Sequence, residues 1–161
     1  MKMAVVGAGA IGGYLGARLA LSGEEVTFIA RNENLSAINE RGFRLILEDG
    51  SVQHAHGVRA VRDPADAGSQ DVVLLTLKAH QVHQVLPQLR ALFGPETVVV
   101  TMINGVPWWY FHRLAGPYEG LGLTSVDPGG VIARHIETDR VIGSVVYPAA
   151  EPVEPGVGRV I

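Results

Sequence analysis

Six residues near the start of the chain, Gly7-Ala8-Gly9-Ala10-Ile11-Gly12, have the spacing G-x-G-x-x-G. In a strand-turn-helix unit the first glycine permits a tight turn, the second lets a pyrophosphate reach backbone N–H groups, and the third lets the helix approach the sheet. The spacing alone is weak evidence, because it also occurs by chance. Here an apolar strand (residues 3–6), an amphipathic helix and a second strand (residues 25–30) surround it. The sequence therefore predicts a dinucleotide site formed by Gly7, Ala8, Gly9, Ala10, Ile11 and Gly12.

The end of the second strand indicates which dinucleotide binds. NAD-binding units of this kind place an acidic residue about 20 positions after the glycines, where it binds the ribose 2′-OH. In this chain Arg31 stands there. A guanidinium cannot accept a hydroxyl proton, but it forms charge-assisted hydrogen bonds with a 2′-phosphate. Arg31 therefore favours NADP (NADPH), and the alternative is a solvated Arg31 with Glu33 binding the ribose of NAD.

Polar residues also follow two later apolar runs. Lys78 comes directly after residues 71–77, and Asn104-Gly105 follow residues 97–103. Ligands of an open parallel sheet bind beyond the carboxyl ends of its strands, so we expect these residues to share one crevice with the glycine turn. Lys78 could pair with a substrate carboxylate or a cofactor oxygen, and the Asn104 amide could donate to a carbonyl or a ribose hydroxyl. The simpler interpretations are a solvated lysine and an ordinary Asn-Gly turn.

Alternating strands and helices must position these residues. Apolar, β-compatible runs predict further strands at 58–61, 71–77, 97–103, 131–136, 141–147 and from about 157. Asp49-Gly50 between residues 43–47 and 52–55 predicts a β-hairpin. A helix is expected at 81–93, split or kinked by Pro87 near Val85 and ended by Gly94-Pro95. The fold class is a Rossmann-like, doubly wound α/β domain over residues 1–161, with a mainly parallel sheet and an inserted hairpin.

The composition limits the function classes. The chain has 161 residues, a net charge of −3 and no cysteine. No basic surface is expected to attract nucleic acid, and no apolar run approaches the ~20 residues that a membrane span needs. The absence of cysteine excludes disulfides and thiolate metal sites and fits a cytoplasmic protein. His54 and His56, and His80 and His83, are expected to be solvated, so no metal is predicted.

The chain resembles the 2-dehydropantoate 2-reductases, also called ketopantoate reductases, over essentially its whole length. The segments that carry the resemblance are, in order, GAGAIGGYLGARLALSGEEVTFIAR, LKAHQ, INGV and IGSVVYPAAEPVEPGVGRV. Lys78-Ala79-x-Gln81 followed by Asn104-Gly105 is more selective than the glycine pattern, which many dehydrogenases share.

The resemblance implies NADPH-dependent reduction of ketopantoate to (R)-pantoate, in the biosynthesis of pantothenate and coenzyme A. It implies that Arg31 holds the 2′-phosphate, that Lys78 and Asn104 serve the catalytic site, and that Leu77, Gln81 and Gly105 also contact the cofactor. Family members carry a helical C-terminal domain with a general-acid lysine and a substrate-binding glutamate, which have no counterpart here. The chain ends within a predicted strand, so we expect it to be the cofactor-binding half of a longer protein, incomplete for catalysis.

Two other interpretations remain open. The stretch at 107–136 is longer and more aromatic than is typical of the family, which would suit another 2-oxo acid substrate. A regulatory module that binds NAD(P) without catalysis would also explain the missing domain. In each case the expected partner is a small molecule, such as a 2-oxo acid. A homodimer is the only assembly with another macromolecule that we expect.

Overall fold

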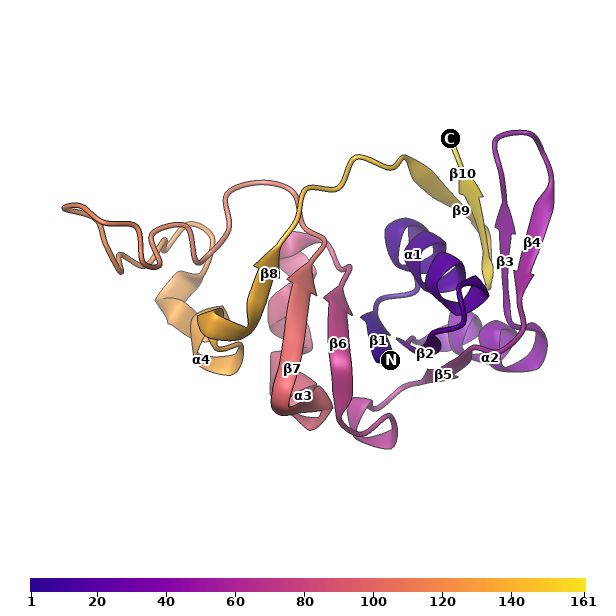
Figure 1. Cartoon of the computed structure of the whole chain (residues 1–161), viewed down its shortest axis with the longest axis horizontal. Helices are drawn as coiled ribbons and strands as arrows, with labels where there is room; N and C mark the ends of the chain where they lie inside the picture. Colours follow the sequence, from indigo (N-terminus) through magenta and orange to yellow (C-terminus); the bar gives the residue numbers. More distant parts are fainter.

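The centre of the molecule is a six-stranded, entirely parallel sheet. The computed structural model describes residues 1–161. The strands are β1 (Lys2–Val6), β2 (Glu25–Ile29), β5 (Arg59–Val61), β6 (Gln70–Leu75), β7 (Phe93–Thr101) and β8 (Val141–Gly143). Their order is β5-β2-β1-β6-β7-β8 (Figure 1). The chain builds the sheet outward from β1 in one direction and then from β6 in the other, which confirms the predicted doubly wound α/β fold.

Both faces of the sheet are buried, which explains the continuous apolar runs of its central strands. Along β1, Val5 points into one apolar cluster, and Ala4 and Val6 point into the other. The first cluster includes side chains of α1 (Ala10–Leu21) and α2 (Asn32–Arg41), and the second those of α3 (Leu86–Leu89) and α4 (Val131–His135). The short 3-10 helices are η1 (Pro64–Asp66), η2 (Ala79–Gln84), η3 (Arg90–Leu92), η4 (Pro128–Gly130) and η5 (Thr138–Arg140).

A smaller sheet packs against α1. Its strands are β3 (Phe43–Ile46), β4 (Val52–Ala55), β9 (Ala150–Glu154) and β10 (Val157–Val160), in the order β4-β3-β10-β9. The antiparallel β3 and β4 confirm the predicted hairpin, and β10 pairs with β3 in parallel and with β9 in antiparallel orientation. Because α1 contacts strands of both sheets, it lies between them (Figure 1).

Two glycines let α1 approach both sheets closely. A Cβ at Gly16 would lie 2.4 Å from Cζ of Phe28 in β2, and one at Gly13 would lie 2.2 Å from Cζ of Phe43 in β3. The two rings stack with their centroids 5.6 Å apart. Each helical glycine costs up to ~1 kcal/mol relative to alanine, and burial of a Phe side chain, worth ~1.5–3 kcal/mol, offsets that cost.

The strand expected at residues 131–136 is wrong, because Val131–His135 form α4. The carboxylate of Asp127, a buried residue, accepts hydrogen bonds from the backbone N–H groups of Ile132 (2.8 Å) and Ala133 (3.0 Å). It thereby satisfies donors of the first helical turn, which have no partner within the helix.

Two other elements differ in extent from their prediction. The strand expected at 141–147 is β8 alone, and the chain then crosses from β8 to β9 (Figure 1). The expected helix at 81–93 is divided near Pro87, as predicted, into η2, α3 and η3. Gly94-Pro95 do not end that helix, since both residues lie in β7, which begins at Phe93.

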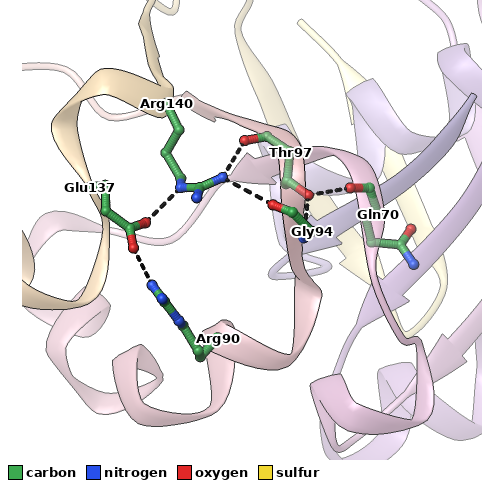
Figure 2. Close-up of polar contacts among 6 residues, drawn as sticks. All are labelled: Gln70, Arg90, Gly94, Thr97, Glu137 and Arg140. Carbon is green, nitrogen blue, oxygen red and sulfur yellow. Dashed lines mark hydrogen bonds and ion pairs between the residues drawn. The ribbon is translucent and has the colours of Figure 1, made fainter.

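A network around Glu137 fixes the segment before β8 to β7 (Figure 2). The Glu137 carboxylate accepts hydrogen bonds from Arg90 and from Nε of Arg140 (2.6 Å). Arg140 also donates to the carbonyl oxygen of Thr97 (2.6 Å), and its guanidinium lies 5.2 Å from the centroid of the Phe93 ring. The hydrogen bonds from Arg90 and then Arg140 lower the pKa of Glu137 to about 2. The network therefore stabilises the fold most when Glu137 is ionised.

None of the helices has both the length and the apolar character needed to cross a lipid bilayer.

Candidate functional site

A cavity of about 600 Å³ lies at the carboxyl edge of the parallel sheet. Most of the predicted site residues line it: Gly7, Ala8, Gly9, Ala10, Ile11, Arg31, Leu77, Lys78, Gln81 and Asn104. Gly12 and Gly105 are not part of the lining. These residues come from four loops that are distant in sequence. The structure therefore brings together the groups predicted by the strand-end rule, which states that ligands of an open parallel sheet bind beyond the carboxyl ends of its strands.

The glycine turn between β1 and α1 has the shape of an anion site. Gly7 has a φ of +108°, which side chains disfavour, and a Cβ at Gly12 would lie 1.9 Å from the carbonyl oxygen of Gly7. Gly9, in contrast, has no heavy atom within 4 Å of a Cβ added there, so the space beside it is open to a ligand. No side chain caps the start of α1. Its first backbone N–H groups therefore remain available to an anion.

Thr76, directly after β6, holds this turn in place. Its hydroxyl oxygen lies 2.9 Å from the carbonyl oxygens of both Val6 and Gly7, so it can donate to either. Thr76 also lines the cavity. Sequence reasoning missed it because the residue falls within the apolar run of the predicted strand at 71–77.

Every charged side chain that lines the cavity is positive. These are Arg31 after β2, Arg62 after β5 and Lys78 after β6, and no aspartate or glutamate is among the lining residues. The chain as a whole has more acidic than basic residues, with a net charge of −3. Glu33, the alternative ribose-binding residue, lies outside this lining. The cavity therefore has a local charge opposite to that of the protein and suits an anionic ligand.

The loop after β6 is ordered by Gln81. Its side-chain oxygen accepts a hydrogen bond from the backbone N–H of Lys78 at 3.1 Å, which closes the first turn of η2. The Lys78 side chain is exposed and has no hydrogen-bond or ion-pair partner in the protein. Its ammonium group is therefore free to meet a ligand, whereas Gln81 has a role in shaping the loop.

Asn104 pairs with a segment far along the chain. Its Nδ2 donates to the carbonyl oxygen of Val146 (3.0 Å), and its Oδ1 accepts from the N–H of Val146 (2.9 Å). An amide has two N–H bonds and two lone pairs, so one of each remains for a ligand. The pairing also anchors the segment that crosses from β8 to β9 (Figure 1). Val146 lines the cavity as well, and no local sequence signal indicates this pairing.

Arg62 and Asn34 also line the cavity, and neither was predicted from the sequence. The Asn34 side-chain oxygen accepts a hydrogen bond from the N–H of Gly156 (2.9 Å) and so joins α2 to the turn before β10. Arg62 had a usable signal, because it directly follows the predicted strand at 58–61. The strand-end rule that selected Arg31 and Lys78 selects Arg62 equally well.

The aromatic segment does not form part of the cavity wall. Trp108 is a buried residue of one core cluster, and Trp108, Trp109, Tyr110 and Phe111 are all absent from the cavity lining. His54 and His56 lie outside it too, with their rings stacked 5.3 Å apart.

The polar groups follow the strand order along the edge of the sheet. Arg62 and Arg31 lie at one end, the glycine turn is central, and Lys78 and Asn104 follow β6 and β7. Adjacent strands are ≈ 4.8 Å apart, so this series suits an elongated ligand with several anionic groups. The series could hold an NAD(P)-type dinucleotide, for which the strand-end position of such sites would put the pyrophosphate at the glycine turn and the reactive ring toward Lys78 and Asn104.

Comparison with known protein families gives a match to the model described as Ketopantoate reductase PanE/ApbA, over residues 3–108. Among curated proteins, the 2-dehydropantoate 2-reductase of Mesorhizobium japonicum is 52% identical over 160 residues, which are 99% of this chain and 48% of that enzyme. An uncharacterized oxidoreductase of Bacillus subtilis, YkpB, is 32% identical over 105 residues, or 65% of this chain and 34% of that protein. This chain spans about half the length of the Mesorhizobium relative.

Solved structures show the same relationship. A protein of Ralstonia solanacearum MolK2 assigned as a ketopantoate reductase superposes with a TM-score of 0.91 at 46% identity, covering 99% of this chain and 49% of that one. The 2-dehydropantoate 2-reductase of Geobacter metallireducens GS-15 has a TM-score of 0.78 at 27% identity, with coverages of 99% and 46%. A D-mandelate dehydrogenase solved with NADH shares the fold, with a TM-score of 0.78 at 22% identity and coverages of 100% and 46%.

Proposed function

The chain belongs to the ketopantoate reductase PanE/ApbA family, and on that premise we propose that it is the nucleotide-binding part of an NADPH-dependent 2-dehydropantoate 2-reductase. The proposed overall reaction converts the ketone of 2-dehydropantoate to the secondary alcohol of (R)-pantoate, with one hydride and one proton added. Reduced nicotinamide supplies the hydride when it is bound. The proposed cellular place is the cytoplasm, which the cysteine-free composition fits.

The observation that carries the proposal is the charge and shape of one cavity. An open glycine turn at the start of α1 shares it with three cationic side chains and no acidic one. The backbone N–H groups of the turn would bind the pyrophosphate, since a helix N-terminus attracts anions. Simple binding of a neutral metabolite would need neither the turn nor the cations.

Arg31 supports NADPH over NADH. The Arg31 side chain lines the cavity and has no hydrogen-bond or ion-pair partner in the protein. Glu33 does not line this cavity, and borders a neighbouring hollow that it shares with Gly9 and Arg31. An arginine at this place offers a guanidinium that donates hydrogen bonds to a 2′-phosphate. It cannot accept a hydrogen bond from the ribose 2′-OH, as the acidic residue of an NAD site does. We therefore assign Arg31 the 2′-phosphate and regard NADPH as the cofactor.

Lys78 and Asn104 are the proposed catalytic residues within this chain. The Lys78 ammonium is unpaired and would attract the carboxylate of a 2-oxo acid or an oxygen of the cofactor. The remaining N–H of the Asn104 amide would donate to the ketone oxygen or to a ribose hydroxyl. Both residues would position and polarise the substrate, and the proton for the alkoxide would come from a group outside this chain. The proposed small-molecule partner is thus a 2-oxo acid. The only protein partner included in the proposal is a second copy of the chain, in a homodimer.

The test is equilibrium binding of NADPH and NADH to the chain and to its Arg31→Ala variant. The variant should bind NADPH about ten-fold or more weakly, because a charge-assisted phosphate contact is lost, and should bind NADH almost as before. NADH thus serves as the internal control for folding. Equal losses for the two nucleotides would contradict the assignment of Arg31, and no binding of either by the unaltered chain would contradict the nucleotide site.

A further inference from the structure

Arg62 is the one cation of the cavity to which the function proposed above assigns no individual role. It directly follows β5, which pairs in parallel with β2 so that Val61 lies opposite Ile29. The N–H of Ala30 donates to the carbonyl oxygen of Val61 at 2.9 Å, which continues the pairing to the residue before Arg31. Arg62 and Arg31 therefore leave the ends of adjacent strands, ≈ 4.8 Å apart, at the same edge of the sheet.

Neither arginine has its charge neutralised by the protein. Every other arginine except Arg41 has a side-chain hydrogen bond or ion pair. Arg41 lies outside the cavity, while Arg31 and Arg62 both line it. Asp63, the acid next to Arg62 in sequence, instead accepts a hydrogen bond from the N–H of Ala65 (2.9 Å) in η1. The two unpaired arginines thus face one cavity whose lining holds no acidic side chain. Arg62 also borders another neighbouring hollow, which Arg41, Glu33 and Glu40 line, but it forms no ion pair there.

This pair matches the charge of a phosphate monoester. Such a group carries −1.5 to −2 charges at pH 7 and three acceptor oxygens, so one guanidinium neutralises only part of it. The pyrophosphate is expected at the glycine turn after β1, and Lys78 follows β6 on the far side of β1. Arg62 is therefore on the adenosine side of the site, where Arg31 is, and not on the side of the reacting ring.

We propose that Arg62 is a second specificity-determining residue for NADPH, and that the 2′-phosphate is held between the guanidinium groups of Arg31 and Arg62. The proposal rests on the nucleotide site and the NADPH preference described above. In this arrangement Arg31 and Arg62 bind opposite oxygens of the same phosphate. Each arginine separately favours NADPH, and NADH gains from neither.

The test uses two adenosine fragments that differ by the phosphate in question: adenosine 2′,5′-bisphosphate and adenosine 5′-monophosphate. Calorimetric titration of the 161-residue chain should show tighter binding of the bisphosphate. Arg62→Ala should weaken the bisphosphate about ten-fold and change the monophosphate by less than about two-fold, because only the first makes a charge-assisted contact with Arg62. Arg62→Lys should retain an intermediate affinity, since it keeps the charge but loses the bidentate geometry.

Arg41→Ala is the matched control, because it removes an equally unpaired, exposed arginine outside the cavity. It should leave both affinities unchanged, and thermal unfolding of all variants should match that of the unaltered chain. Unchanged bisphosphate binding by Arg62→Ala, or an equal loss for both fragments, would overturn the role of Arg62 while leaving the nucleotide site intact. If the unaltered chain binds neither fragment, the proposed function fails and the role of Arg62 fails with it.

Discussion

Substitution of Gly9 by alanine should separate the nucleotide site from the stability of the fold. Gly9 is exposed, its φ is −82°, and no heavy atom lies within 4 Å of a Cβ built on it. The folded protein can therefore hold a methyl group at this position without strain. A pyrophosphate at the turn would lie in the same open space, so the methyl group would meet the ligand and not the protein.

The expected change in stability is small because two effects oppose each other. Alanine is a poorer N-cap than glycine by roughly 0.5–1 kcal/mol. It also lowers the conformational entropy of the unfolded chain, which stabilises the fold by ≈ 0.4–1 kcal/mol. The free energy of unfolding should thus stay within about 1 kcal/mol of its original value. Loss of one or two charge-assisted hydrogen bonds from the turn, ~1.5–3 kcal/mol each, should weaken NADPH binding at least about ten-fold.

The assay is urea unfolding for stability and NADPH fluorescence titration for binding. Gly57→Ala is the matched control, because Gly57 is exposed, has equally open surroundings and lies outside the cavity. It should leave both properties unchanged. Gly12→Ala should instead destabilise the protein by about 1–3 kcal/mol, since its Cβ would meet the backbone oxygen of Gly7 at 1.9 Å. Normal NADPH binding by Gly9→Ala would refute the placement of the pyrophosphate at this turn.

The sequence predicted the central strands because their environment is uniform. β1 and β6 are buried on both faces, so every position favours an apolar residue and the run is visible without its partners. Residues 131–136 are similarly apolar, but Val131–His135 form the helix α4. The group that starts this helix, Asp127, bonds to N–H groups five and six residues later. A cap normally bonds two or three residues ahead, so the usual N-terminal pattern does not occur there.

The predictability of the site also depends on distance along the chain. The glycine turn and Arg31 belong to one strand-turn-helix-strand unit, whose spacing is fixed by local geometry. Asn104 was predicted as a strand-end residue. Its pairing with Val146 joins residues 42 positions apart, so no pattern in the neighbouring sequence indicates it. The open space at Gly9 and the free charge of Arg62 are likewise properties of the assembled fold. Sequence spacing therefore identifies which loops meet, whereas the free or occupied state of each polar group requires the structure.

Two further predictions concern the polar contacts around the sheet. Asn104→Ala should destabilise the fold by about 1–2 kcal/mol and speed hydrogen exchange at the Val146 amide, because it removes both hydrogen bonds to Val146; unchanged exchange would contradict this anchoring. Glu137→Gln should lower the free energy of unfolding by about 1 kcal/mol at pH 7. The pKa of Glu137, lowered from 4.5 to about 2, corresponds to about 3 kcal/mol of stabilisation at most. Solvent screens part of this, because the side chain is 45% exposed. A lowered folded-state pKa gives stability that is full above pH 4.5 and is lost as the pH falls toward 2, so the difference in urea unfolding between wild type and variant should shrink at pH 3. A difference of the same size at both pH values would show that the ionised carboxylate is not what stabilises the contact with Arg90 and Arg140.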